Sequence, residues 1–282
     1  MNSCYLCNTG NFTTRQGIVR DNPSLQIYEC LNCGLVFLSS FDHITQNFYE
    51  NSGMHDGSVD LDAWLKETSW DDERRFNSLR RDIENRNILD FGCGNGGFLA
   101  KARHFAKNAA GIEPDKSVIE RFRKINIPVF SNVNDAPGSY DIITLFHVLE
   151  HLPDPRATLK KLANLLNNSG QIIVEVPNSS DALLSLFNCD SFTKFTYWSC
   201  HLFLFNQSTL KKLIDQTGLR LNYIKQVQRY PLSNHLYWLA KGQPGGHQHW
   251  SFLDSPELHC AYENQLASIS ACDTLLASFS VN

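Results

Sequence analysis

The sequence predicts an α/β fold built on a mostly parallel sheet. Strand-like apolar segments alternate with helix-prone segments from residue 86 onward, a pattern typical of βαβ units. A glycine-rich loop follows the first of these strands directly. The 282 residues, of which 42% are hydrophobic and 19% charged, suffice for one large domain with a small appendage.

The predicted elements follow one another in a regular order. Right-handed crossovers are expected between successive parallel strands, with ligands bound at the carboxyl ends of the strands. The predicted strands are 87–91, 109–113, 129–130, 140–146, 171–176, 221–227 and 273–279, and the predicted helices of the core are 98–102, 116–125 and 156–166.

Residues 1–40 contain two C-x-x-C pairs, which predict a small zinc-binding module. Two such pairs supply the four thiolates that zinc accepts in a closed structural site. A set of reduced core cysteines is the alternative, and a redox pair is disfavoured because neither pair opens a helix after a buried strand. The predicted metal ligands are Cys4, Cys7, Cys30 and Cys33.

Residues 41–85 form a predicted helical lead-in to the core. Apolar positions between Trp64 and Ile83 are compatible with an imperfect amphipathic helix that packs against the core domain. The preceding segment 48–50 is aromatic and could instead cover a ligand.

The glycine loop 92–97 lets the backbone approach a ligand closely, and by itself it fits two cofactor classes. Its spacing also satisfies the G-x-G-x-x-G pattern of dinucleotide-binding oxidoreductases, and Glu113, at the end of the second strand, suits the ribose of either ligand. Asp90 precedes the loop, where a carboxylate could accept bonds from loop amides or attract a cationic group. A dinucleotide pyrophosphate would be repelled there.

The segment 90–96 resembles motif I of the class I S-adenosylmethionine (SAM)-dependent methyltransferases, with the pattern D-x-G-x-G-x-G. Segment 111–115 resembles the acidic ribose-binding motif of that family, and 146–152 resembles its H-V-L-E-H segment after the fourth strand. The resemblance implies a Rossmann-like, seven-stranded, mostly parallel sheet with helices on both faces. It also implies SAM as the cofactor, with binding residues Asp90, Gly92, Cys93, Gly94, Gly96, Glu113, Pro114 and Phe146. Segment 132–135 lies where the family often contacts adenine, but a surface turn is an equal alternative.

Three histidines and one glutamate are the candidate catalytic residues. An imidazole near the mouth of the sheet could remove a proton from the attacking group of an acceptor, although a histidine there could also simply bond to backbone. A metal triad of the three histidines is conceivable, but no carboxylate spacing recommends it. His201 lies in a segment that resembles the family's entry to a late helix. The candidates are His147, His151, Glu150 and His201.

Residues 230–271 are predicted to be an insertion that caps the substrate cleft. Two aromatic-rich segments are joined there by a glycine-proline turn, before the strand predicted at 273–279. A helical pair on the surface is the alternative. The methyltransferase core is therefore expected to span 86–229 and 272–282.

The cysteine module and the core together resemble bacterial zinc-ribbon methyltransferases of sugar, polysaccharide and secondary-metabolite modification. The resemblance implies methyl transfer to an oxygen, nitrogen or carbon atom of a small molecule, such as a sugar or nucleotide-linked sugar. The alternatives are an RNA methyltransferase and a SAM-binding protein without catalysis. The formal net charge of −4 disfavours a nucleic-acid partner. The absence of a signal-like start or an apolar span predicts a cytoplasmic protein that does not enter a membrane.

Overall fold

The computed structural model describes residues 2–45, 47–51, 54 and 60–281. Part of the predicted lead-in, residues 46, 52–53 and 55–59, therefore lies outside the described residues.

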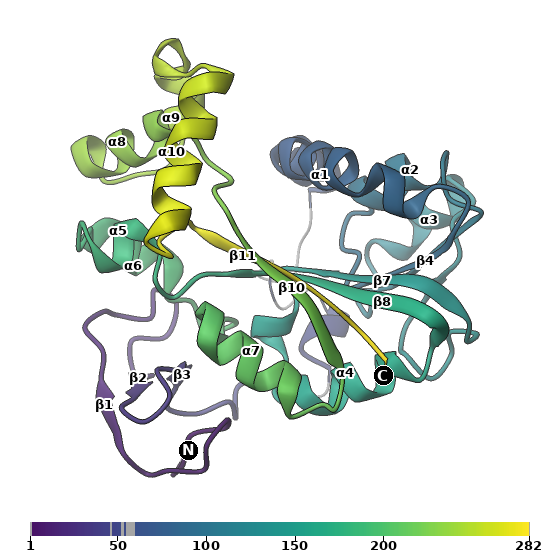
Figure 1. Ribbon diagram of the computed structural model, residues 1–282, viewed down its shortest axis with the longest axis horizontal. Helices are drawn as coiled ribbons and strands as arrows, with labels where there is room; N and C mark the ends of the chain where they lie inside the picture. The colour runs from purple at the N-terminus through teal and green to yellow at the C-terminus, as the bar shows by residue number, and fades with distance from the viewer. Residues whose placement is uncertain (1, 46, 52–53, 55–59, 282) are drawn as a thin grey trace.

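A seven-stranded sheet forms the centre of the molecule, in the spatial order β10-β11-β8-β7-β4-β5-β6 (Figure 1). Strands β4 to β8 pair in parallel, whereas β11 runs antiparallel to both of its neighbours, β8 and β10. The predicted seven-stranded, mostly parallel sheet is confirmed. Its strands are β4 (Asn87–Phe91), β5 (Asn108–Ile112), β6 (Val129–Phe130), β7 (Tyr140–Phe146), β8 (Leu166–Pro177), β10 (Arg220–Val227) and β11 (Thr274–Ser280).

Helices cover both faces of this sheet (Figure 1). One face carries α1 (Leu61–Ile83), α2 (Gly97–Ala102) and α3 (Ile119–Lys124), which share an apolar cluster that includes Phe76, Phe98 and Phe122. The other face carries α4 (Pro155–Ala163) and α7 (Gln207–Asp215), whose leucines join the larger core cluster. The two apolar layers bury the sheet from both sides and fix the positions of its strand ends.

Local side-chain caps begin several of these helices. The Asp60 side chain accepts a hydrogen bond from the amide of Ala63 at the start of α1, and Asn206 forms a capping box with Thr209 at the start of α7. The predicted helix 156–166 is too long, because α4 ends at Ala163 and β8 already begins at Leu166. β8 begins where Leu166 pairs with Tyr140 of β7, and a register shift then separates this pair from the one between Gln171 and Ile142.

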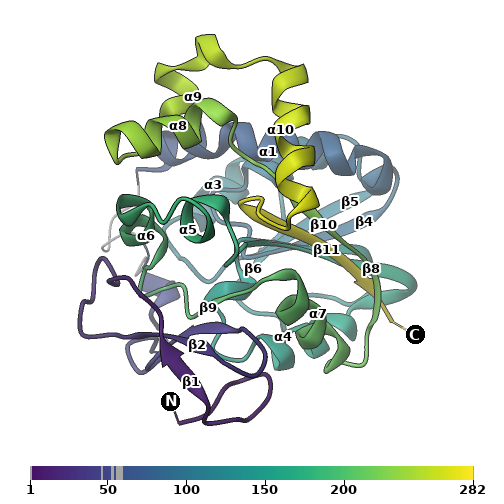
Figure 2. The ribbon, with the colours of Figure 1, turned by 60° about the vertical axis from the view of Figure 1, so that its left-hand side comes forward.

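A second, four-stranded sheet joins the N-terminal module to the core (Figure 2). Its strands are β1 (Phe12–Thr14), β2 (Ile27–Cys30), β3 (Val36–Leu38) and β9 (Phe203–Leu204), in the order β1-β2-β3-β9 and all antiparallel. Because β9 belongs to the core segment of the chain, the module and the core share one continuous sheet.

The remaining described helices flank this framework. Two short helices, α5 (Ala182–Ser185) and α6 (Asp190–Thr196), follow β8, and the 3-10 turns η1 (Tyr49–Asn51) and η3 (Leu149–His151) lie near the carboxyl ends of the parallel strands. None of the helices in the described parts of the chain is both long and apolar enough to cross a bilayer.

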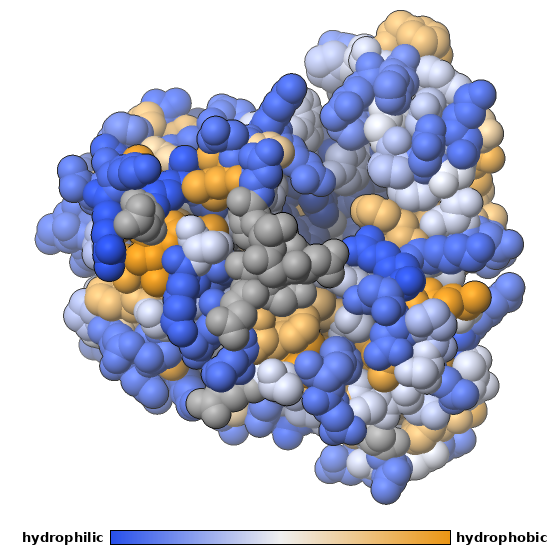
Figure 3. Space-filling view, turned by 180° about the vertical axis from the view of Figure 1, so that it is seen from behind, coloured by the Kyte–Doolittle hydropathy of each residue, from blue (hydrophilic) through white to orange (hydrophobic). Residues whose placement is uncertain are grey.

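Residues 230–271 form a helical lobe that projects beyond the sheet (Figure 1). It contains α8 (Leu232–Lys241), α9 (Gly246–His249), η4 (Ser251–Leu253) and α10 (Pro256–Ser268). His235 Nδ1 lies 2.7 Å from the Tyr262 hydroxyl and so links α8 to α10. From behind, the surface is hollowed between this lobe and the rest of the molecule (Figure 3).

Candidate active site

A cavity of about 390 Å³ lies at the carboxyl ends of β4, β5 and β7. Parallel α/β sheets bind ligands at this edge, because the loops after the strands converge there. Cofactor residues predicted from the sequence contribute to its wall, namely Asp90, Gly92, Cys93, Gly94, Glu113, Pro114 and Phe146. Segment 132–135 forms an exposed turn in which the Asn134 amide bonds to the Asn132 side chain, which agrees with the surface-turn alternative.

A larger hollow of about 700 Å³ lies between the N-terminal module and α5–α6. Its wall includes Arg15, Glu29 and Lys194 and no residue of the glycine loop. We place the active site in the smaller cavity, because the strand ends and the glycine loop meet there.

The glycine loop between β4 and α2 requires residues without a Cβ. Gly92, Gly94 and Gly96 have φ angles of 72°, 51° and 75°, in the left-handed region that other residues rarely occupy. A Cβ on Gly96 would lie 2.4 Å from the ring of Phe122. Gly96 therefore shapes the loop from behind the cavity and is absent from the cavity's described lining.

Glu113, at the end of β5, is bonded to the glycine loop. Its Oε2 accepts a hydrogen bond from the Gly94 amide at 2.8 Å, and its Oε1 accepts one from the Asp115 amide at 3.0 Å. Of the two roles predicted for Asp90, the bond to a loop amide is thus made by Glu113 instead. Asp90 Oδ1 accepts a hydrogen bond from the Thr144 hydroxyl at 2.7 Å.

Three carboxyl groups in the cavity wall have raised pKa values. Nearby positive charge does not offset the cost of burying their ionised forms. Burial, together with the charges of Asp72 and Glu113, raises the pKa of Asp90 to about 7. Burial also raises the pKa values of Asp72 and Glu113. A cationic ligand would favour the ionised forms of all three groups, whereas a pyrophosphate would oppose them.

The predicted histidine segment forms a short turn, as its prolines indicate, and His147 precedes it with a φ of 54°. His147 Nδ1 lies 3.2 Å from Glu150 Oε1, and its Nε2 lies 3.0 Å from Arg229 Nη1 and 3.3 Å from Glu175 Oε1. Both ring nitrogens are therefore engaged, so His147 would have to break a contact before it accepted a proton.

His151 and His201 are oriented differently from His147. His151 Nδ1 lies 2.7 Å from the Cys200 carbonyl oxygen, and His201 Nδ1 lies 2.9 Å from that of Thr196. Donation by each Nδ1–H leaves the Nε2 atom with a lone pair. Burial lowers the pKa of both rings, that of His201 to about 4.

Glu150, His151 and His201 form one cluster, hereafter the EHH cluster. One potential ligand atom from each lies within 4.8 Å of the others, and the two rings are 5.1 Å apart between centroids. The triad considered from the sequence contained His147, but the structure replaces it with Glu150. His151 lines the cavity, whereas Glu150 and His201 are not among its described lining residues.

Helix α1 supplies polar groups to the cavity that the sequence analysis missed. The sequence indicated packing for this helix, yet Trp64, Thr68, Asp71, Asp72 and Arg75 line the cavity. Asp71, Asp72 and Arg75 are charged and yet buried in the structure, and charged residues are seldom buried unless they are paired or have a function. Their presence in a helix that packs against the core was the signal that could have indicated this role.

A buried charge network joins α1 to the strand ends. Glu175, a single acid within the apolar β8, accepts hydrogen bonds at 2.8 Å from both Arg74 and Arg75. Arg229, just before the helical lobe, bonds through Nε to Asp71 at 3.1 Å. These contacts hold α1, β8 and the base of the lobe around His147.

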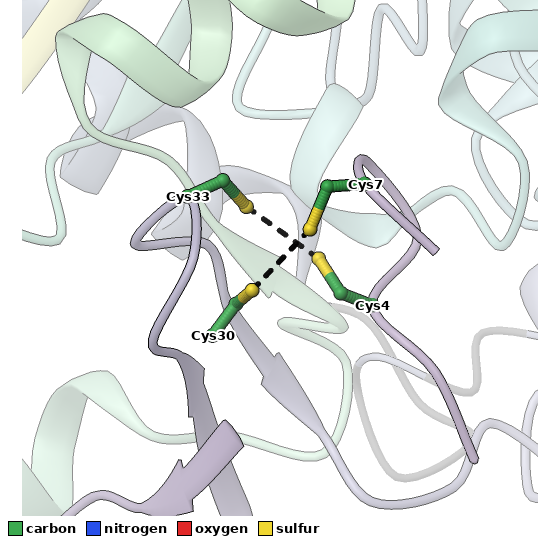
Figure 4. A group of neighbouring side chains, drawn as sticks. All are labelled: Cys4, Cys7, Cys30 and Cys33. Atoms are coloured by element: carbon green, nitrogen blue, oxygen red, sulfur yellow. Dashed lines mark hydrogen bonds between the residues drawn. The ribbon is translucent and has the colours of Figure 1, made fainter. Parts of the chain in front are cut away.

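The four predicted zinc ligands converge in the N-terminal module (Figure 4). The Sγ atoms of Cys4 and Cys33 are 3.5 Å apart, as are those of Cys7 and Cys30. Tetrahedral zinc with Zn–S bonds of 2.3 Å would separate its sulfurs by about 3.8 Å. The donor set and its spacing therefore fit a structural zinc ion.

The N-terminal module also holds part of the EHH cluster in place. The Leu38 amide at the end of β3 donates to the Leu202 carbonyl at 3.0 Å, and the Leu202 amide donates to the Glu150 carbonyl at 2.9 Å. Because Leu202 follows His201 directly, the shared sheet positions that histidine against Glu150.

Known proteins resemble this chain in sequence and fold. Residues 62–224 match the family model described as a methyltransferase domain. The ubiquinone biosynthesis O-methyltransferase of Acinetobacter baylyi is 26% identical over 175 residues, which are 56% of this chain and 73% of that protein. The tRNA U34 carboxymethyltransferase of Campylobacter fetus is 30% identical over 132 residues, which are 42% of this chain and 47% of that protein.

A solved structure extends the likeness to the fold. The magnesium protoporphyrin IX methyltransferase of Synechocystis, with bound SAH, superposes with a TM-score of 0.53 at 11% identity and covers 86% of this chain and 100% of that one. The family match spans more than half of the chain and includes the glycine loop, Glu113 and the EHH cluster's turn. The chain therefore belongs to the methyltransferase domain family and is a SAM-dependent methyltransferase.

Proposed function

We propose that this enzyme methylates a hydroxyl oxygen of a small molecule. The observation that supports an oxygen acceptor is the EHH cluster, which places two imidazoles and a carboxylate oxygen within 4.8 Å of one another beside the cavity. Groups of this kind assist the loss of a hydroxyl proton. Its curated relatives include O-methyltransferases of ubiquinone biosynthesis, which agrees with an oxygen acceptor. The sugar acceptor stays a prediction that rests on the sequence resemblance alone.

The cofactor end of the cavity is assigned to the glycine loop and the carboxylates around it. Glu113 would accept hydrogen bonds from the ribose hydroxyls, and Gly92 and Gly94 would let the backbone approach the ligand. Asp72 and Asp90 would face its cationic groups, which would offset their raised pKa values. Apolar contacts would come from Cys93, Pro114 and Phe146.

When bound, SAM supplies a methyl group on a positively charged sulfur, so the protein chiefly has to orient the acceptor and ionise it. We assign ionisation of the hydroxyl to the EHH cluster. His147 is assigned a positioning role, because Glu150, Glu175 and Arg229 occupy both of its ring nitrogens.

We further propose that a structural zinc ion binds the four cysteines and that residues 230–271 limit access to the acceptor side. The position of the lobe supports the second part, since Arg229 at its base lines the cavity. The zinc ion would stabilise the sheet that positions His201.

The test combines cofactor binding with an acceptor screen. Calorimetry should detect binding of SAM and not of NAD. Transfer of labelled methyl should occur to phenolic or sugar hydroxyls and not to RNA, and His151→Asn should reduce kcat with little change in SAM affinity. Binding of NAD alone would refute the methyltransferase mechanism proposed for this cavity, and labelled RNA as the sole product would refute the small-molecule acceptor.

A further inference from the structure

The EHH cluster contains a buried carboxylate oxygen without a hydrogen-bond partner in the described parts of the chain, which is unusual for a site that only accepts protons. Glu150 has no exposed surface, and its Oε2 has no hydrogen-bond partner among the described residues. Its other oxygen, Oε1, lies 3.2 Å from His147 Nδ1. Buried carboxylate oxygens without partners are rare, because they lose their hydration without compensation.

The two histidines of the cluster are held as metal ligands usually are. In metal sites a ligating imidazole commonly donates its second N–H to a backbone carbonyl, which fixes the tautomer and the ring orientation. His151 and His201 each place Nδ1 against such a carbonyl, at 2.7 Å and 2.9 Å. This leaves the Nε2 lone pairs for a ligand.

The carboxylate of Glu150 and the two imidazoles meet at one place. The ligand atoms of the three residues lie within 4.8 Å of one another, and a tetrahedral ion with ligands at 2.0–2.1 Å would bring such atoms to about 3.3 Å. Two imidazoles and one carboxylate suit divalent transition metals such as Zn²⁺ or Fe²⁺.

We propose that Glu150, His151 and His201 bind a divalent transition-metal ion, separate from the ion of the cysteine module. His151 borders the cavity, so the free coordination positions would face the acceptor. A divalent ion there would lower the pKa of a hydroxyl that coordinates it, which is how the EHH cluster would ionise an acceptor, and the released proton would pass to solvent water. In that respect the inference rests on the proposed O-methyl transfer.

The two metal sites differ in chemistry, and this makes the proposal testable on the intact protein. The cysteine module offers four sulfurs, whereas the EHH cluster offers two nitrogens and one oxygen. Co²⁺ added to the protein with its cysteine module loaded with zinc should bind at about one equivalent. It should show visible d–d bands without sulfur-to-cobalt charge-transfer absorption.

Three ligand variants and one control variant assign the ion to its ligands. His201→Asn and Glu150→Gln should each weaken Co²⁺ binding at least tenfold. The matched control His104→Asn alters an exposed histidine and should bind Co²⁺ like the wild type. His201→Cys supplies a sulfur at the same position and should bind Co²⁺ with a new charge-transfer band, which a variant that merely misfolds would not produce.

Two outcomes would overturn the proposal. One is the failure of the zinc-loaded wild type to bind an equivalent of Co²⁺, and the other is unchanged Co²⁺ affinity in His201→Asn. Calorimetry with SAM on the same samples separates this inference from the proposed function. SAM binding with methyl transfer but without a second metal would reject the metal site alone, whereas a second metal without SAM binding would reject the proposed function and keep the site.

Discussion

The carboxylate of Glu113 accepts a hydrogen bond from the Gly94 amide at 2.8 Å, which ties the end of β5 to the glycine loop that follows β4. Two adjacent strand ends are thereby locked together where the cofactor is expected to lie. One carboxylate both shapes the loop and lines the cavity.

Replacement of Glu113 is therefore expected to weaken SAM binding. Glu113→Gln should reduce the affinity about 10- to 100-fold, because charge-assisted hydrogen bonds contribute about 1.5–3 kcal/mol each. Calorimetry measures the change, with the exposed Glu84→Gln as the matched control. Equal affinities in the two variants would remove Glu113 from the cofactor site.

The backbone of the glycine loop predicts a stability difference between two glycine variants. Gly96→Ala should lower the free energy of unfolding by about 1–3 kcal/mol, because it combines a positive φ with a clash against Phe122. Gly138→Ala is the control, since a Cβ there meets nothing within 4 Å. Urea denaturation compares the two, and a loss as large in Gly138→Ala would contradict the steric explanation.

The raised pKa of Asp90 predicts a pH dependence of cofactor binding. Its pKa of about 7 lies above its ordinary value of 3.8, so the cofactor-free protein holds a proton there that the unfolded chain loses. The contribution of Asp90 to stability therefore falls as pH rises from about 4 to 7. SAM, as a cation, favours the carboxylate, so its affinity should rise about tenfold between pH 6 and pH 8.

The variant Asp90→Asn should flatten this pH profile and bind SAM more weakly at pH 8. Asp135→Asn, which changes an exposed aspartate, should keep the wild-type profile. Calorimetry across this pH range measures both, and a wild-type affinity that did not change between pH 6 and pH 8 would rule out the proposed contact.

The cysteine module predicts a structural effect of zinc on a distant histidine. Cys4→Ser should lose one zinc ion per chain and increase hydrogen exchange at the Leu38 and Leu202 amides, since β3 and β9 lie in one sheet with the module. Cys260→Ser, at an exposed cysteine, should change neither. Exchange confined to residues before β3 would show that the module does not support His201.

The ion pair between Asp71 and Arg229 predicts a large and specific loss of stability. Asp71→Asn should lower the free energy of unfolding by about 3–5 kcal/mol, because it leaves the largely buried Arg229 without its carboxylate partner. Asp215→Asn breaks the exposed pair with Lys211 and should cost less than about 1 kcal/mol. Denaturant titration measures the free energy of unfolding of both variants. Similar losses would show that the ion pair between Asp71 and Arg229 stabilises the protein no more than an exposed pair does.

Much of the fold could be predicted from local sequence patterns. Buried parallel strands such as β4 and β7 are continuous apolar runs, and the left-handed turn after β4 requires glycine. The start of β8 could not be predicted in this way, since Leu166 pairs with Tyr140 of β7 across a register shift that separates it from the apolar run of the strand. Backbone hydrogen bonds do not depend on the apolar pattern that sequence reasoning follows.

The candidate site also combines residues that the sequence indicates with contacts that only the tertiary structure sets. The histidine segment made His147, Glu150 and His151 candidate catalytic residues, but the sequence cannot say which ring nitrogen is free. That depends on carbonyl groups of 196 and 200 and on Arg229, which are distant in the chain.

By itself, the sequence determined the α/β class, the glycine loop, the paired cysteines and the methyltransferase family. These features are encoded by residue types at short spacing, where local backbone geometry and side-chain chemistry suffice. Only the tertiary structure decided that α1 lines the cavity, that β9 joins the two sheets, and that Glu150 meets His201. Such contacts arise from the packing of segments far apart in the chain, and no local spacing records them.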